Sequence, residues 1–133
     1  MNTLTVFNGF SVSDADATRD FYSNIVGLEI EDEKMGLRYK LPSGSTTFMY
    51  VKPDHKPAEY TVLNFVVSDI VAAVDELIAK GVKFEMYDNL YTGATQDEKG
   101  ILRSPDQQKY GPSIAWFKDP SGNILSVIED KTA

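Results

Sequence analysis

The hydrophobic pattern of the chain changes its period in the same order in both halves. Apolar runs of strand length occupy residues 4–12 and again residues 61–67. Each run is followed by apolar side chains that recur every three or four residues, which is the spacing of one helix face. These helical positions are Ala17, Phe21 and Ile25 in the first half, and Ile70, Val74, Leu77 and Ile78 in the second. Each half is therefore predicted to open with a strand followed by a helix.

The residues at the ends of these helices agree with that prediction. A Ser-Asp pair precedes each helix, at residues 13–14 and 68–69. Short side chains with oxygen atoms accept hydrogen bonds from the free N–H groups of a first helical turn, where a negative charge is also favourable. Gly27 and Gly81 follow the helical stretches, and glycine is the residue that most often ends a helix.

Three further strand-like runs follow each helix. They occupy residues 28–32, 37–41 and 46–51 in the first half, and residues 82–87, 113–118 and 124–129 in the second. Residues 42–44 and 119–122 combine Pro, Ser and Gly, which is typical of turns between strands. Residues 52–59 contain two prolines and are predicted to be a linker, and residues 89–111 form a long polar loop. Each half thus has the order β-α-β-β-β.

The two halves also match residue by residue. At an offset of 55 positions the identical pairs include Phe10 and Phe65, Val12 and Val67, Ser13 and Ser68, and Asp14 and Asp69. Matches at one fixed spacing, in the same predicted elements, indicate an internal repeat. The length of 133 residues suits one domain with one core. We therefore predict a single α+β domain over residues 1–133, with module one at about residues 1–53 and module two at about residues 60–130.

Composition narrows the classes of partner. The formal net charge is −7, whereas nucleic acid or an anionic membrane surface would favour a basic face. No cysteine is present, which excludes disulfides and thiolate chemistry and makes the cytoplasm the expected compartment. The first ten residues show no signal peptide pattern, and no apolar run approaches the length of about 20 residues that spans a membrane.

Several motifs resemble those of the vicinal oxygen chelate superfamily, which includes glyoxalase I, bleomycin-resistance proteins and extradiol dioxygenases. They are Val-Ser-Asp before each helix, Phe21-Tyr22 followed by Gly27-Leu28, and the segment Phe-Lys-Asp-Pro-Ser-Gly-Asn at residues 117–123. The resemblance covers almost the whole chain. It implies two βαβββ modules that form curved half-sheets around a shared cavity, the glyoxalase/bleomycin-resistance fold. Members of this family often dimerise, so a homodimer is expected.

The resemblance also implies where a metal ion would be held, and the residues there are poor ligands. Many members bind a divalent cation through His, Glu or Gln at four positions. The corresponding residues are Phe7, Val62, Ser126 and either Thr47 or Met49. None of these is a normal ligand of such a cation. We therefore expect no metal and no other cofactor. The single histidine, His55, lies in the linker and is expected to be solvated, and Glu129 is expected to point away from Ser126.

Alternation along the strands predicts which side chains line the implied cavity. The opening strands would contribute Phe7, Gly9 and Ser11 in module one, and Val62, Asn64 and Val66 in module two. The last strands would contribute Thr47 and Met49 or their neighbours, together with Ile124, Ser126 and Ile128. The facing of Trp116 stays open against Ala115 and Phe117, and Arg103, Tyr91 and Tyr110 of the long loop are candidates at the cavity mouth. The alternative is that the strand residues simply fill the sheet centre and that the loop is solvated.

These features favour binding over catalysis. We predict a glyoxalase/bleomycin-resistance-like protein that binds a small organic molecule in a mainly apolar, metal-free cavity. A buried amide such as that of Asn64 needs partners, which a ligand could provide. The alternative is an enzyme of the same superfamily, a lyase, isomerase or dioxygenase-like protein acting on a small metabolite. No Ser-His or Cys-His pair is expected, and no P-loop or dinucleotide fingerprint is present. A protein that acts mainly through a protein-binding surface is a third possibility.

Overall fold

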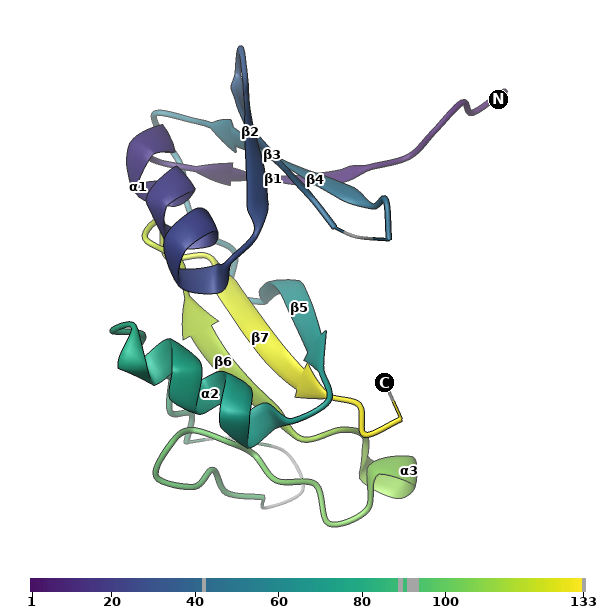
Figure 1. Cartoon of the computed structure of the whole chain (residues 1–133), viewed down its shortest axis with the longest axis vertical. Helices are drawn as coiled ribbons and strands as arrows, with labels where there is room; N and C mark the ends of the chain where they lie inside the picture. Colours follow the sequence, from purple (N-terminus) through teal and green to yellow (C-terminus); the bar gives the residue numbers. More distant parts are fainter. Residues whose placement is uncertain (42, 89, 91–93, 133) are drawn as a thin grey trace. The chain divides into compact units, whose positions relative to one another are not determined.

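A computed structural model describes residues 1–41, 43–88, 90 and 94–132 (Figure 1). The chain divides into two compact units. Unit 1 comprises Met1–Pro57 together with Asp119–Gly122, and unit 2 comprises Ala58–Lys118 together with Asn123–Ala133. The division thus lies in the proline-containing segment, but a four-residue turn from the C-terminal half belongs to unit 1. No helix of the described residues is long and apolar enough to cross a membrane.

Unit 1 is a four-stranded sheet with one helical segment. Its elements are β1 (Asn8–Val12), α1 (Ala15–Asp20), a π-helical turn η1 (Phe21–Val26), β2 (Glu29–Glu33), β3 (Gly36–Lys40) and β4 (Thr46–Val51). The strand order is β1-β4-β3-β2. The pair β1 and β4 is parallel, and the other neighbours are antiparallel. One sheet face carries the core of the unit, whose buried side chains are Phe10, Val12, Leu37, Tyr39 and Met49 together with Phe21 and Tyr22 of the helical segment.

Unit 2 has a three-stranded sheet and a longer helix. Its elements are β5 (Thr61–Val67), α2 (Ile70–Ala79), the short α3 (Gln107–Tyr110), β6 (Ile114–Lys118) and β7 (Ile124–Glu129). The strand order is β5-β7-β6, with β7 parallel to β5 and antiparallel to β6. Figure 1 shows α2 lying along one face of this sheet. That face is the core, with Leu63, Ala115, Phe117, Leu125 and Val127 buried beneath Ile70 and Val74 of the helix.

Two carboxylates cap the start of α2. The side chain of Asp69, the residue before the helix, accepts a hydrogen bond from the Ala72 backbone N–H at 3.0 Å. Glu129 at the end of β7 accepts one from the Ile70 N–H, also at 3.0 Å. Glu129 points away from Ser126, as strand alternation requires. It is only 8% exposed. A charged strand-end residue would ordinarily be solvated, but here the free Ile70 N–H at the start of the helix binds the carboxylate inside the unit.

The cap of α2 gives a test of this packing. We expect Asp69→Ala to lower the free energy of unfolding by about 1 kcal/mol, because the Ala72 N–H loses its acceptor. Asp69→Asn keeps an oxygen at the same place and should change the stability by a few tenths of a kcal/mol. Urea denaturation followed by circular dichroism measures both variants. Equal losses for the two substitutions would contradict a capping role of the side-chain oxygen.

The observed elements confirm the α+β class and most of the predicted strands. The strands predicted at residues 46–51, 61–67 and 124–129 have the predicted ends. The strand predicted at residues 4–12 begins only at Asn8, and Leu4 and Val6 are exposed at 100% and 83%. The short helix α3 lies within the loop that was predicted at residues 89–111.

The strand predicted at residues 82–87 does not form. In this segment the Glu85 N–H donates to the Trp116 carbonyl of β6. A side chain provides further partners: Gln96 donates to the Glu85 carbonyl and accepts from the Tyr87 N–H, both at 2.8 Å. Because a side-chain amide pairs with backbone groups that a neighbouring strand would otherwise occupy, the segment stays irregular.

Candidate functional site

The sheet face of unit 2 that α2 does not cover presents the residues predicted to line a cavity. In the strand register, Ser126 of β7 is the partner of Asn64 on one side and of Trp116 on the other. Ile128 is likewise the partner of Val66 and of Ile114. Paired residues in adjacent strands lie on the same face. We call this surface, made up of Asn64, Val66, Ile114, Trp116, Ser126 and Ile128, the open face. The register resolves the facing of Trp116, which lies here and not with Ala115 and Phe117.

The centre of the open face holds one polar pair. The Ser126 hydroxyl donates to the Asn64 side-chain oxygen at 2.5 Å. Ser126 itself is fully buried, whereas Asn64 is exposed. The Asn64 side-chain oxygen therefore has a hydrogen-bond partner, and the amide NH₂ belongs to an exposed residue. This group can donate a hydrogen bond to a bound molecule.

Apolar and aromatic side chains surround that polar pair. Trp116 is half-buried and meets the ring of Tyr87 edge to face, with 5.5 Å between ring centroids. Val66 is 60% exposed, and Ile114 and Ile128 are half-buried. A flat apolar surface with a single fixed amide donor is suited to a small organic molecule that carries one acceptor atom.

The pairing of β5 with β7 is irregular at Val62. The register of β5 with β7 shifts between Thr61 and Leu63, so that Thr61 is the partner of Ile124 and Leu63 the partner of Leu125. Val62 is the extra residue at this bulge, and Thr61 takes the place beside Ile124. The bulge changes the pairing of Val62 and not its alternation with the buried Leu63, so the predicted grouping of Val62 with Asn64 and Val66 stays a prediction.

The face of the unit 1 sheet opposite its core carries aromatic side chains around one arginine, unlike the open face of unit 2. The Arg38 guanidinium lies over the rings of Phe7 and Phe48, with its carbon 4.6 Å and 5.2 Å from the two ring centroids. Phe48 also stacks on Tyr50 at 6.2 Å. Arg38 donates to both oxygens of Glu33, at 2.7 and 3.3 Å, and this hydrogen bonding lowers the pKa of the Glu33 carboxyl.

Thr47 and Met49 do not share this face. The parallel register makes Thr47 the partner of Asn8 and Met49 the partner of Phe10, whereas Phe7, Gly9 and Ser11 alternate with those residues. The Thr47 hydroxyl donates to Asn8 at 2.7 Å, and Met49 is fully buried in the core. Their predicted placement beside Phe7 is wrong. Phe48 and Tyr50, the neighbours that the prediction left open, take that place, because they are the register partners of Gly9 and Ser11.

Two of the three loop residues predicted at the cavity mouth, Arg103 and Tyr110, lie within the described residues. Arg103 pairs with Asp97, with 3.3 Å between Nε and the carboxylate oxygen, and its side chain is 58% exposed. Tyr110 is 55% exposed at the end of α3. Tyr91 lies outside the described residues. The ligand contacts predicted for Arg103 and the two tyrosines stay predictions.

The positions implied for a metal do not offer a ligand set. Phe7 and Val62 have hydrocarbon side chains, and the Ser126 hydroxyl already donates to Asn64. Over residues 1–41, 43–88, 90 and 94–132, no group of three or more His, Cys, Asp or Glu side chains is arranged to hold an ion. The donors present do not fit the divalent cation that the sequence resemblance implies.

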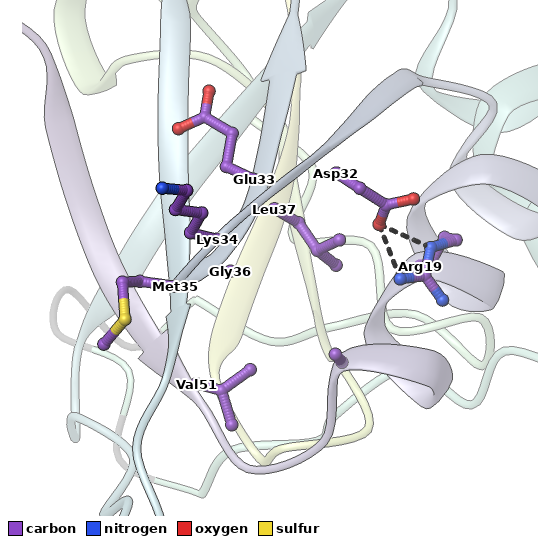
Figure 2. A pocket seen from close by; sticks show the side chains of 9 residues that line it. Arg19, Asp32, Glu33, Lys34, Met35, Gly36, Leu37 and Val51 are labelled. Carbon is purple, nitrogen blue, oxygen red and sulfur yellow. Dashed lines mark hydrogen bonds and ion pairs between the residues drawn. The ribbon is translucent and has the colours of Figure 1, made fainter.

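A separate pocket of about 240 Å³ lies in unit 1 between α1 and the β2–β3 hairpin (Figure 2). Four of its nine lining residues are charged, namely Arg19, Asp32, Glu33 and Lys34, and Met35 lies at the hairpin turn. Arg19 donates to Asp32 at 2.5 and 3.0 Å, and hydrogen bonds with Asp16 and Asp32 raise the pKa of its guanidinium. The pocket contains none of the residues predicted from the sequence.

The histidine of the linker is not solvated as predicted. The Ser11 Oγ and His55 Nδ1 atoms are 2.6 Å apart, and the His55 Nε2 atom is 3.0 Å from the Ser121 carbonyl oxygen. The expectation that no Ser-His pair exists is therefore wrong. The parallel pairing of β1 with β4 causes the contact, since the Lys52 N–H donates to the Val12 carbonyl and brings the following turn beside β1. The local sequence around either residue does not predict this contact, because Ser11 and His55 are 44 positions apart.

Other contacts fix the turn at Asp119–Gly122 within unit 1. The Tyr22 hydroxyl donates to Asp119 at 2.8 Å, and Ser13 bonds the Ser121 hydroxyl through its backbone N–H at 2.9 Å. Asp119 also accepts from the Ser121 N–H at 2.9 Å. Burial, and then the charge of Asp119, raise the pKa of Tyr22. These bonds hold the carbonyl that faces His55 in one position.

Solved structures share this fold at low sequence identity. A glyoxalase family protein from Bacillus anthracis is 19% identical, with 98% of this chain and 99% of that chain covered and a TM-score of 0.67. An antibiotic-binding protein from Streptomyces sp. CB03234 is 19% identical, with 97% and 98% covered and a TM-score of 0.62. A lactoylglutathione lyase from Agrobacterium tumefaciens is 17% identical, with 99% and 98% covered and a TM-score of 0.65.

Among curated protein sequences, none matches this chain. The model of one family matches residues 6–127, which is most of the chain. The fold agrees with that match, since the α+β sheets of units 1 and 2 have the architecture of the solved glyoxalase-type structures. The chain therefore belongs to the Glyoxalase/Bleomycin resistance protein/Dioxygenase superfamily.

Proposed function

We propose that this protein binds a small organic molecule against the open face of unit 2, without a metal ion. The observation that carries the proposal is the central row Asn64–Ser126–Trp116. In this row the hydroxyl of the buried Ser126 donates to the oxygen of the exposed Asn64 amide, and Trp116 is the partner of Ser126 on its other side. A ligand with a carbonyl or ether oxygen could accept from Asn64 while its apolar part covers Trp116 and Val66.

Two further points support binding over metal-dependent chemistry. The side chains at the implied metal positions, Phe7, Val62 and Ser126, supply apolar contacts or a hydroxyl that is already bonded. One solved structure of the same fold is described as an antibiotic-binding protein, so binding without stated turnover occurs in this fold. The acidic chain, with its net charge of −7, favours a neutral or cationic molecule over an anionic one by simple electrostatics.

We also infer a homodimer in the cytoplasm. Strand β5 is at the edge of its sheet, and an edge strand presents unpaired backbone groups to which another chain can add. The lack of cysteine agrees with a reducing compartment. Light scattering at working concentration tests the dimer, and the mass of one chain would contradict it.

Ligand binding can be measured through the only tryptophan of the chain, Trp116. A panel of aromatic and apolar compounds should include members that change its fluorescence and that raise the melting temperature by mass action. For such a compound, Asn64→Ala should weaken binding about two- to tenfold, the value of one hydrogen bond. Asn24→Ala removes an exposed amide from unit 1 and should leave the dissociation constant unchanged.

Two results would contradict this function. The first is a complete panel that neither shifts the melting temperature nor alters Trp116 fluorescence at high concentration. The second concerns the metal-free state: protein purified without chelator should contain far less than one equivalent of any divalent ion. A stoichiometric ion would show that other side chains supply ligands, and the site would have to be assigned again.

A further inference from the structure

We propose that Ser11 of unit 1 is a nucleophile activated by His55, and that it reacts with activated acyl esters such as aryl esters. This site lies in unit 1 and does not depend on the open face of unit 2. It rests on the hydrogen-bonded row Ser11–His55–Ser121 carbonyl, with distances of 2.6 and 3.0 Å.

The partners of the imidazole determine where its proton lies. The Ser121 carbonyl oxygen can only accept a hydrogen bond, so the Nε2 atom that faces it carries the hydrogen. In the neutral ring the Nδ1 atom then has a free lone pair. That lone pair faces the Ser11 hydroxyl, which must donate to it. His55 is thus held in the tautomer that accepts the serine proton, and this is the arrangement by which an adjacent base activates a serine.

The structure also holds the base in place. The His55 backbone N–H donates to the Lys52 carbonyl and closes a turn directly after β4. On the other side, the Ser121 carbonyl belongs to a turn fixed by Asp119 and by Ser13. When Nδ1 takes up a proton, the imidazolium keeps its bond to this carbonyl, whose partial negative charge stabilises the new positive charge. A base oriented by a third group is the general signature of nucleophilic catalysis.

The surroundings of Ser11 suit a flat acyl or aryl group. Ser11 is the register partner of Tyr50, which is 38% exposed and stacked on Phe48. Gly9 precedes Ser11 by two positions on the same face, so the surface next to the hydroxyl carries no side chain there. Phe7, 53% exposed, continues the aromatic surface beyond it. Because activation comes from one histidine, the reaction suits esters with a good leaving group, of which aryl esters are the simplest class.

The proposed steps balance without any further reagent except water. The Ser11 Oγ atom bonds to the acyl carbon while its proton moves to His55 Nδ1. The bond from the acyl carbon to the aryl oxygen then breaks, and the phenol leaves with that electron pair and with the proton from His55 Nδ1. Water next adds to the acyl carbon, giving a proton to Nδ1. The bond from the acyl carbon to Oγ breaks, and Oγ regains a proton. The net reaction converts ester and water to acid and phenol.

Covalent labelling of the full chain tests this inference directly. Incubation with a fluorophosphonate, followed by intact mass and peptide mapping, should give one adduct at Ser11. With p-nitrophenyl acetate, a transient acetyl group should be found on the same residue. His55→Gln keeps an amide that can bond both neighbours but is not a base, and it should slow labelling about a hundredfold or more. Ser11→Ala should abolish the adduct.

The matched control is Ser45→Ala, which removes an exposed hydroxyl from the β3–β4 turn of the same unit and should leave the labelling rate unchanged. Circular dichroism establishes that the variants are folded. A His55 with only a structural role would give no adduct at Ser11. The proposal is overturned by the absence of that adduct in the wild-type protein, by labelling spread over other residues, or by equal rates in wild type and His55→Gln. The first two outcomes are measured on the wild-type protein alone. The proposal can therefore be tested even if a variant does not fold.

Discussion

Replacing Phe117 with alanine is expected to lower the free energy of unfolding by about 3–5 kcal/mol, the usual cost of removing a buried aromatic ring. Phe117 is fully buried at the centre of the unit 2 core. Its ring centroid is 5.4 Å from that of Phe84 and 6.5 Å from that of Phe65. The substitution removes both contacts and leaves a cavity that the strands on either side cannot close.

Since small domains are stable by only about 5–15 kcal/mol, this loss would reach a large part of the total. Urea denaturation monitored by circular dichroism measures it. Val66→Ala is the matched control, because Val66 lies in the same sheet but is 60% exposed on the other face, and it should cost less than about 0.5 kcal/mol. A loss below about 1 kcal/mol for Phe117→Ala would mean that the cluster of the three rings is not the core of the unit.

The second large effect is expected for Tyr22→Phe, with a loss of about 1–3 kcal/mol near neutral pH. Tyr22 is fully buried, and its hydroxyl donates at 2.8 Å to Asp119, which is 5% exposed. The phenylalanine ring fills the same space but leaves one carboxylate oxygen of Asp119 without this donor. When a buried charged acceptor loses its donor, most of the free energy spent on removing it from water is no longer offset by a hydrogen bond. Tyr60→Phe, at a tyrosine that is 71% exposed, should leave the stability unchanged.

The loss for Tyr22→Phe should also depend on pH in a defined direction. Burial, followed by the charge of Asp119, raises the pKa of Tyr22 in the folded protein. In the unfolded chain a tyrosine loses its proton near about pH 10. Above that pH the unfolded state binds fewer protons than the folded state, so the free energy of unfolding falls as the pH rises. The contribution of Tyr22 is therefore complete below about pH 10 and is lost above it. The difference between wild type and Tyr22→Phe should shrink from pH 8 to about pH 11; a constant difference would contradict the buried, neutral phenol.

The elements that local pattern determines could be predicted from the sequence. The strand runs at Thr46–Val51, Thr61–Val67 and Ile124–Glu129, and the caps at Asp14 and Asp69, follow from alternation and from short oxygen side chains. Residues 82–87 show the limit of such reasoning. They have a strand-like pattern, but the Gln96 side chain forms hydrogen bonds with their backbone groups. The local sequence pattern does not show that a side chain from another segment will do so.

In the candidate sites too, local pattern predicted some features, and others depended on contacts between distant parts of the chain. Alternation along the strands was enough to place Asn64 and Ser126 on one face, whereas the facing of Trp116 stayed open until the strand register was known. The faces of Thr47 and Met49 were assigned wrongly, because a one-residue error in register reverses every side chain of a strand. The contact between Ser11 and His55 was missed because it depends on the parallel pairing of strands that are far apart in sequence. A motif search detects spacing along the chain but not pairing across a sheet.

The turn at Asp119–Gly122 has a consequence for how the protein is made. Unit 1 contains the N-terminal residues, yet its bonds from Tyr22 to Asp119 and from Ser13 to Ser121 span 97 and 108 positions. During synthesis the ribosome releases most of unit 1 early, but these partners emerge only with the last part of the chain. The N-terminal unit therefore cannot reach its final hydrogen bonding as an independent nascent domain, unlike the usual order in which N-terminal domains are completed first. During any pause in translation before the C-terminal strands, the hydroxyl of Tyr22 would lack its hydrogen-bond acceptor, Asp119.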